Sequence, residues 1–181
     1  MPAAELGNAG DTPAATAKID TLKIVSGGQT GVDRAALDVA LKHRIPCGGW
    51  CPEDRTDEDG KIPDRYPVTP LKKGGPNQRT ARNVRDSDGT IIIYFHEFMG
   101  GTAYTVGCCI EQRQPHRLID AAKYSPEDAV PLLAAFMRDH DIDILNIAGP
   151  RQSEWAGGYD YTFRAVDVLL SRIKFSARRR R

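Results

Sequence analysis

"IVSGGQTGVDRAAL", residues 24–37, is the stretch that decides the fold. Its apolar start ends at Ser26, a glycine-rich turn follows, and a helical pattern begins near Asp33. A strand, a glycine-rich turn and a helix in direct succession are typical of the first part of a βαβ unit, and the start of the helix can bind an anion. This stretch therefore predicts an α/β protein with an anion site at the end of its first strand.

The spacing of the glycines distinguishes this turn from two familiar nucleotide motifs. A Walker P-loop needs a lysine after its last glycine, but Val32 follows Gly31. A Rossmann fingerprint needs Gly-x-Gly-x-x-Gly, which Gly27, Gly28 and Gly31 do not form. We therefore predict a nest of backbone amides, backed by the helix dipole, that binds a phosphate. The side chains that can add donors are those of Ser26, Gln29 and Thr30.

Five short β-rich runs alternate with helical patterns along the chain. The expected strands are Leu22 to Ser26, Ile45 to Trp50, Thr90 to Phe95, Arg117 to Asp120 and Ile142 to Ala148. The expected helices are Asp33 to His43, Asn77 to Ser87, Thr102 to Gln114, Ser125 to His140 and Tyr161 to Ile173. The run "TIIIYF" is apolar almost throughout, as in parallel strands that are covered on both faces. The alternation predicts a doubly wound, mainly parallel sheet with helices on both faces, that is, a Rossmann-like fold.

Length and charge limit the possible organisation and partners. With 181 residues, one domain is expected over residues 21–173, after a disordered leader at 1–20 and before a basic tail at 174–181. The balance of 25 basic and 24 acidic residues gives a net charge of +1, so nucleic-acid binding is not expected. No apolar stretch approaches the ~20 residues that cross a bilayer. The start lacks the features of a signal peptide, and we predict a cytoplasmic protein with no membrane contact.

Four cysteines, Cys47, Cys51, Cys108 and Cys109, are too few for a disulfide scaffold in a chain of this size. Neither they nor the histidines show the spacing of metal ligands. Reduced, mostly buried thiols and no metal site are expected.

Two further glycine-rich stretches follow later strands. "FMGGTAYTV" places Gly100 and Gly101 before Thr102 and Thr105, and "NIAGPRQSE" contains Gly149 and Arg151. Ligands of open α/β sheets bind outside the carboxyl ends of the strands, where all three stretches fall. The three stretches together predict one anion pocket.

Other polar and aromatic residues leave alternatives open. Arg79, Arg82 and Arg85 recur on one side of the expected helix, where one or two can clamp a phosphate or all can pair with Asp86 and Asp88. Asp33 is either a partner of the helix dipole or a ligand group. The tryptophans, Trp50 and Trp155, can stack on a flat ring or pack in the core.

The segment at residues 51–78 is rich in prolines and charges and breaks the alternating pattern. A loop of this length in a compact domain is usually functional or disordered. We expect it to act as a lid over the ligand, although a solvated excursion or a subunit contact would have the same composition.

Several long motifs resemble those of the molybdenum-cofactor carrier family. The motifs are "IVSGGQTGVDRAALDVA", "GGWCPEDRTDEDGKIPDRYP", "RTARNVRDSDGTIII", "GGTAYT" and "LNIAGPRQSE". That family is a branch of a Rossmann-like group that includes the LOG phosphoribohydrolases and the DNA-processing protein DprA. The resemblance implies a dimer or tetramer that binds molybdopterin cofactor or a related nucleotide at its glycine-rich loops, with molybdoenzymes or cofactor-synthesis proteins as partners.

One departure from the phosphoribohydrolases bears on catalysis. Their glycine motif resembles Pro-Gly-Gly-x-Gly-Thr-x-x-Glu, and its glutamate acts with an arginine in cleaving the base from its ribose phosphate. Here the equivalent region presents Val106 and Gly107, and the nearest carboxylates in sequence are Glu97 and Glu111. We therefore expect a carrier without catalytic residues; the alternative is a nucleotide N-glycosidase or phosphohydrolase that uses the same pocket.

Overall fold

The computed structural model describes residues 21–178, with side chains described up to Ile173. The expected leader at residues 1–20 and the end of the basic tail at 179–181 lie outside the described residues. The central sheet is parallel throughout, with strands β1 (Lys23–Val25), β2 (Cys47–Gly48), β7 (Gly89–Tyr94), β8 (His116–Asp120) and β9 (Ile144–Ala148). The helices are α1 (Val32–His43), α2 (Pro76–Arg85), α3 (Gly100–Glu111), α4 (Pro126–Asp139) and α5 (Gly158–Arg178).

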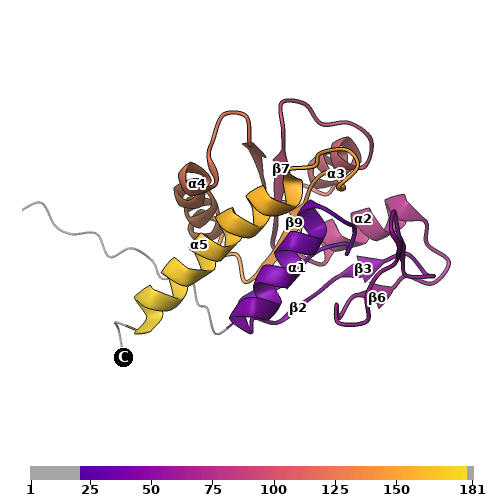
Figure 1. The fold of residues 1–181 in the computed structure, drawn as a ribbon, viewed down its shortest axis with the longest axis horizontal. Helices are drawn as coiled ribbons and strands as arrows, with labels where there is room; N and C mark the ends of the chain where they lie inside the picture. The colour runs from indigo at the N-terminus through magenta and orange to yellow at the C-terminus, as the bar shows by residue number, and fades with distance from the viewer. Residues whose placement is uncertain (1–20, 179–181) are drawn as a thin grey trace, which may run out of the picture.

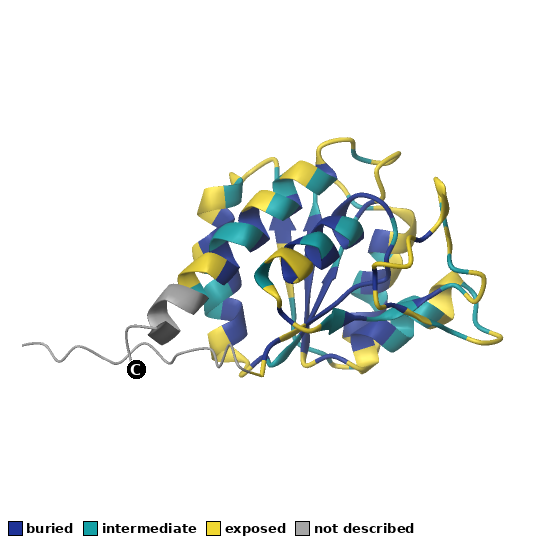
Figure 2. Ribbon diagram, turned by 60° about the horizontal axis from the view of Figure 1, so that its bottom comes forward, coloured by how far each residue is buried: buried dark blue, intermediate teal, exposed yellow. Residues whose placement is uncertain are grey.

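Helices cover both faces of the sheet, as predicted (Figure 1). Helices α1, α4 and α5 pack together on one face, and α2 packs against α3 on the other. Side chains of β7 point alternately to the two faces, which explains this arrangement. Ile91 and Ile93 join the large cluster beneath α1, α4 and α5, whereas Ile92 joins Val84 and Cys109 on the opposite face. Figure 2 shows the strands as a buried layer between helices with exposed outer surfaces.

The order of the strands across the sheet is β2-β1-β9-β7-β8. If β9 is numbered as the first strand of the sheet and the numbering continues through β1, β2, β7 and β8, this order becomes 3-2-1-4-5. That is the order of a doubly wound nucleotide-binding sheet. The last strand of this chain therefore occupies the central position that the first strand has in that fold. The direction of winding reverses between β9 and β7, and ligands of such sheets bind in the crevice at this point.

The expected strand at Ile45 to Trp50 is wrong as a single element. The chain leaves the central sheet at Gly49, whose φ is +135°, and continues as β3 (Trp50–Cys51), which pairs with β6 (Thr69–Pro70) in a separate two-stranded sheet. A Cβ at Gly49 would collide with the carbonyl oxygen of Ser26, so only glycine allows this close approach.

The helix ends that we expected differ from the observed helix ends by a few residues. Helix α4 begins as expected, because the hydroxyl of Ser125 accepts a hydrogen bond from the Asp128 amide (3.2 Å) and Pro126 occupies the first turn. Helix α5 extends to Arg178. No helix in residues 21–178 is long and apolar enough to cross a membrane.

Candidate ligand-binding pocket

A narrow pocket lies where the sheet reverses its winding, between the ends of β9 and β7. We call it the switch-point pocket. It has a volume of about 60 Å³, whereas a pocket for a whole small molecule has roughly 300 to 1,000 Å³. It can therefore hold one compact group. The predicted residues that line it are Gly27, Gln29, Asp33, Arg79, Gly101, Thr102, Thr105, Gly149 and Arg151.

Five of the expected binding residues do not line this pocket. The buried Ser26 donates its hydroxyl to the carbonyl oxygen of Ile147 (2.7 Å). Gly28, whose φ is +80°, faces the side chain of Ile62. The hydroxyl of Thr30 is hydrogen-bonded to other residues, and Gly100 lines a neighbouring chamber.

Arg82 is the fifth, and its guanidinium lies 4.6 Å from the centre of the Trp50 ring. Arg82 also pairs with Asp86 (3.7 Å), and Arg85 pairs with the same carboxylate (2.8 Å). Of the three arginines on this helix, therefore, only Arg79 lines the switch-point pocket.

Five lining residues were missed by sequence reasoning: Thr80, Asn83, Asn146, Ala148 and Glu154. Asn146 stands inside an otherwise apolar strand, and its amide donates to the hydroxyl of Thr90 (3.2 Å). A polar residue in a buried strand was the available signal, since buried polar groups need partners. Asn83 is held by hydrogen bonds to the backbone of Trp50, which no spacing in the sequence indicated.

Arg79 supplies a positive charge at the pocket wall. Its Nη1 atom lies 3.4 Å from the carbonyl oxygen of Gly27, and its buried Nε has no hydrogen-bond partner among the described residues. Gln29 is similar, because its side-chain Oε1 is also buried and unpartnered. A half-buried guanidinium with a buried, unused Nε donor favours an anion with two or more oxygen atoms.

Asp33 brings a carboxylate into the same pocket. Burial raises the pKa of Asp33 to about 6, and the Arg79 charge together with hydrogen bonds from the backbone amides of Gln29 and Gly27 opposes the rise. The amide of Gln29 lies 3.4 Å from the carboxylate. Asp33 thus contacts part of the amide nest that the sequence assigned to the ligand, and it is an acid–base group as well as a helix-start residue.

The start of α1 is closed to a ligand. Its N-cap is Gly31 at φ +74°, and the amide of Val32 lies 3.3 Å from the carbonyl oxygen of Pro150. A Cβ at Gly31 would lie 2.7 Å from the same oxygen. Within this turn, positive φ values occur at Gly28 and Gly31.

The start of α3 is less crowded, although the amide of Thr102 already donates to the carbonyl oxygen of Met99 (3.2 Å). Met99 is the N-cap residue and provides no side-chain hydrogen bond, and a Cβ at Gly101 would meet no atom within 4 Å. Gly101 and Thr102 line the pocket. Because the first amides of a helix carry the positive end of its dipole, the start of α3 could bind an anion here.

The third glycine-rich stretch forms a turn after β9 rather than a helix start. The amide of Arg151 donates to the Glu154 carboxylate (3.2 Å), and the two side chains also pair (3.5 Å). Arg151 lines both the switch-point pocket and a larger chamber of about 690 Å³ beside it.

Residues 51–75, which we call the flap, form the other wall of this larger chamber. The flap has a small core of its own, where Cys51, Ile62, Tyr66 and Val68 pack on Leu37 of α1. Strands β4 (Thr56–Asp57) and β5 (Gly60–Lys61) pair as a hairpin within it. The expected lid is thus a folded segment in this structure.

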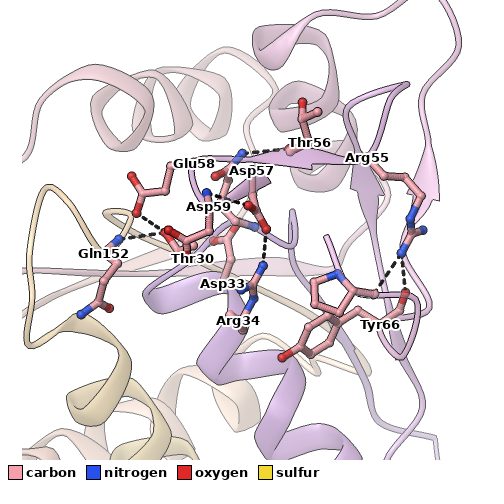
Figure 3. Close-up of polar contacts among 12 residues, drawn as sticks. Thr30, Asp33, Arg34, Arg55, Thr56, Asp57, Glu58, Asp59, Tyr66 and Gln152 are labelled. Atoms are coloured by element: carbon pink, nitrogen blue, oxygen red, sulfur yellow. Dashed lines mark hydrogen bonds and ion pairs between the residues drawn. The ribbon is translucent and has the colours of Figure 1, made fainter. Parts of the chain in front are cut away.

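Two flap carboxylates fasten it to the domain (Figure 3). Asp57 pairs with Arg34 of α1, and Glu58 binds the Thr30 hydroxyl. Glu58 also accepts from the amide of Ser153 (3.0 Å). Burial alone would raise the pKa of Glu58, but hydrogen bonds from Ser153 and Thr30 outweigh it and lower the pKa. The glycine turn, the flap and the turn after β9 therefore meet at Thr30.

The cysteines have no part in the switch-point pocket. All four are free, and Cys51, Cys108 and Cys109 are buried. Burial raises the pKa of Cys109 to about 11. The described residues contain no group of three or more side chains that could hold a metal ion.

The fold defines a Rossmann-like α/β protein, and its candidate site lies at the reversal point of the sheet. The chain belongs to the circularly permutated YpsA SLOG family, which residues 24–170 match. The permutation agrees with the central position of β9 in the sheet.

A solved structure from Syntrophus aciditrophicus SB, called a "putative molybdenum carrier protein", is similar to this chain. The two are 43% identical, the alignment covers 82% of this chain and 94% of the other, and the TM-score is 0.80. No curated protein sequence matches the chain significantly. The resemblance found in the sequence motifs is thus confirmed by both the family match and the related structure.

Proposed function

We propose that the switch-point pocket binds the phosphate of a pterin cofactor or a related nucleotide, and that the protein carries this ligand without breaking a bond in it. The observation that supports this most directly is the buried, unpartnered Nε of Arg79 beside the start of α3. Both features suit a phosphate, which accepts several charge-assisted hydrogen bonds. The name of the related structure points to the molybdenum cofactor as the cargo.

The residues in the pocket fit such a cargo. Arg79 and the first turn of α3 would hold the phosphate, with Thr102 and Thr105 adjacent. The small volume of about 60 Å³ suits this one group and leaves the rest of the molecule for the neighbouring chambers. Transfer to a molybdoenzyme or a cofactor-synthesis protein, and assembly as a dimer or tetramer, remain predictions from the resemblance.

Hydrolysis is the second candidate function, and Asp33 is the observation that favours it. Val106 packs against the apolar cluster of Val84, Ile92 and the buried cysteines, so α3 provides no acid at the position where the phosphoribohydrolases have one. Asp33, however, is a pocket carboxyl whose pKa is raised to about 6 by burial. A group with that pKa could accept or donate a proton near neutral pH.

The two functions are separated by a binding and turnover experiment. The protein is purified without oxygen, and any copurifying small molecule is identified by mass spectrometry. Calorimetry with nucleoside monophosphates is then run beside an assay for free base and inorganic phosphate. Stoichiometric binding without product supports the carrier; multiple turnover that Asp33→Asn abolishes while binding persists would establish the hydrolase.

A further inference from the structure

A second chamber, of about 350 Å³, adjoins the switch-point pocket and shares Thr102 and Glu154 with it. We call it the aromatic chamber. Its volume falls within the range of small-molecule sites, roughly 300 to 1,000 Å³. The side chains that form most of its wall are Phe95, Glu97, Phe98, Met99, Pro150 and Trp155.

Apolar side chains in this chamber are exposed more than their size would favour. Met99 is 77% exposed and Phe95 is 44% exposed. The rings of Phe95 and Trp155 are stacked, with centroids 5.7 Å apart and an angle of 18° between them. Trp155 in turn packs against the main hydrophobic core, which holds the pair of rings in place. A stacked aromatic pair beside an exposed methionine suits a flat ring, since aromatic and thioether groups both favour such contacts.

The segment that carries these residues is held in an unusual backbone conformation. His96 has a φ of +60°, and the amide of Glu97 donates to the carbonyl oxygen of Phe95 (2.7 Å). The buried carboxylate of Asp120 at the end of β8 accepts from the amide of His96 (3.1 Å). Here the turn places Phe95 and Glu97 on the same chamber wall.

The two carboxylates of the chamber differ in what they contact. Glu154 is paired with Arg151 and accepts from its amide. Glu97 has neither a side-chain hydrogen bond nor an ion pair to any residue in the described part of the chain. It is a free acceptor at the edge of an apolar slot, and a carboxylate accepts hydrogen bonds but donates none.

We infer that the aromatic chamber binds the heterocycle of the phosphorylated ligand, and that Glu97 selects a ring with a 2-amino-4-oxo pyrimidine edge over an adenine. The inference rests on the proposed binding of the phosphate in the adjoining pocket. Guanine and pterins share this edge, where an N–H and an amino group donate side by side. Adenine presents an acceptor nitrogen next to its amino group. This nitrogen would face a carboxylate oxygen, and two acceptors repel each other.

The larger chamber under the flap is a poorer place for the ring. Its walls carry Glu53, Asp54, Asp57 and Glu58, together with Arg79 and Arg151. No aromatic side chain lines it. A flat apolar ring gains more from Phe95 and Met99 than from a surface of carboxylates that are already bonded to backbone, hydroxyl or guanidinium groups.

The test is calorimetry of the full chain with GMP, AMP and ribose 5-phosphate as probes. The variants are Glu97→Gln and Met99→Ala, with Ile110→Ala as the matched control, because Ile110 is another exposed apolar residue (63%) and lies near the far end of α3, outside the aromatic chamber. Melting temperatures confirm that each variant folds. Wild-type protein is expected to bind GMP about 10- to 100-fold more tightly than AMP, the usual range for one paired edge contact.

Glu97→Gln should remove most of this preference and leave ribose 5-phosphate binding unchanged. Met99→Ala should weaken both nucleotides by several-fold without affecting ribose 5-phosphate, and Ile110→Ala should change none of the three. Equal affinities for GMP and ribose 5-phosphate would overturn the ring site while the phosphate site stands. A preference for AMP, or for GMP that Glu97→Gln does not alter, would overturn the role of Glu97. Failure of all three probes to bind would overturn the proposed function as well.

Discussion

The turn after β1 and the turn before α3 have similar glycine-rich sequences but different environments. In the first, Gly27 lies between Arg79 and Asp33, and the amide of Val32 already contacts a carbonyl oxygen. In the second, Gly101 faces open space at the start of its helix. A glycine pair therefore indicates where backbone comes close to something, but the partner can be the protein itself or a ligand. We expect the first turn to position charged side chains and the second to offer amides.

Gly27→Val should have the largest effect on binding. A Cβ at this position would collide with Nη1 of Arg79 and lie 2.8 Å from Oδ2 of Asp33. Both atoms belong to side-chain ends that can move, so the fold should survive while the charged wall of the pocket is displaced. Displacement of the Arg79 donor, together with a valine side chain at the pocket wall, predicts a decrease in phosphate affinity of roughly 100-fold or more. Calorimetry with ribose 5-phosphate measures it, and wild-type affinity in a folded variant would show that the first turn does not shape the site.

Asp33→Asn tests whether the first turn holds its carboxylate at a cost in stability. The folded-state pKa of about 6 lies above the ordinary value of 3.8, so the protonated form is the one that folding favours. This contribution is complete below pH 4 and is lost as the pH rises through 6. The free energy of unfolding of Asp33→Asn, relative to that of wild type, should therefore increase as the pH rises, by up to about 3 kcal/mol for a pKa shift of two units.

Urea denaturation of both proteins at pH 4.5, 6 and 8 measures this difference. Asp54→Asn is a control, because Asp54 is fully exposed and its pKa is lowered by hydrogen bonds from Thr56. A stability difference between Asp33→Asn and wild type that stays constant over this range would mean that Asp33 remains ionised throughout.

Arg79→Ala and Arg82→Ala compare two arginines of one helix, of which only Arg79 lines the pocket. Removing one charged donor predicts a roughly 10- to 100-fold loss of ribose 5-phosphate affinity for Arg79→Ala. Arg82→Ala should leave this affinity unchanged, since its guanidinium stacks on Trp50. Comparable losses in both variants, measured by calorimetry, would place the ligand elsewhere.

Gly101→Ala should have the smallest effect and complete the comparison. Its Cβ would meet no atom within 4 Å, and alanine favours a helix by up to about 1 kcal/mol over glycine. We expect an equal or slightly higher melting temperature and a phosphate affinity within about threefold of wild type, because the backbone amide is retained. A loss as large as that of Gly27→Val would mean that the second turn is as tightly packed against its ligand as the first is against the protein.

Much of the fold followed from local pattern. The apolar run at Ile91 to Ile93 predicted a strand covered on both faces, and the helical pattern from Ser125 predicted α4; both are confirmed. The break at Gly49 was missed because a β-rich run says nothing about which sheet each half joins. The core of the flap was missed for a related reason, since Ile62, Tyr66 and Val68 have no regular period and meet only by packing on α1.

The sequence by itself determined the βαβ alternation, the three glycine-rich turns and the family, because these depend on periodicity and on short motifs that act locally. The tertiary structure alone decided which members of those motifs face one another. It brought β9 to the centre of the sheet, directed Arg79 into the pocket and Arg82 onto Trp50, and buried Asp33 beside amides that were assigned to a ligand. The physical reason is that charge, burial and hydrogen bonding at this site arise between residues about 50 to 120 positions apart, and spacing along the chain does not determine such contacts.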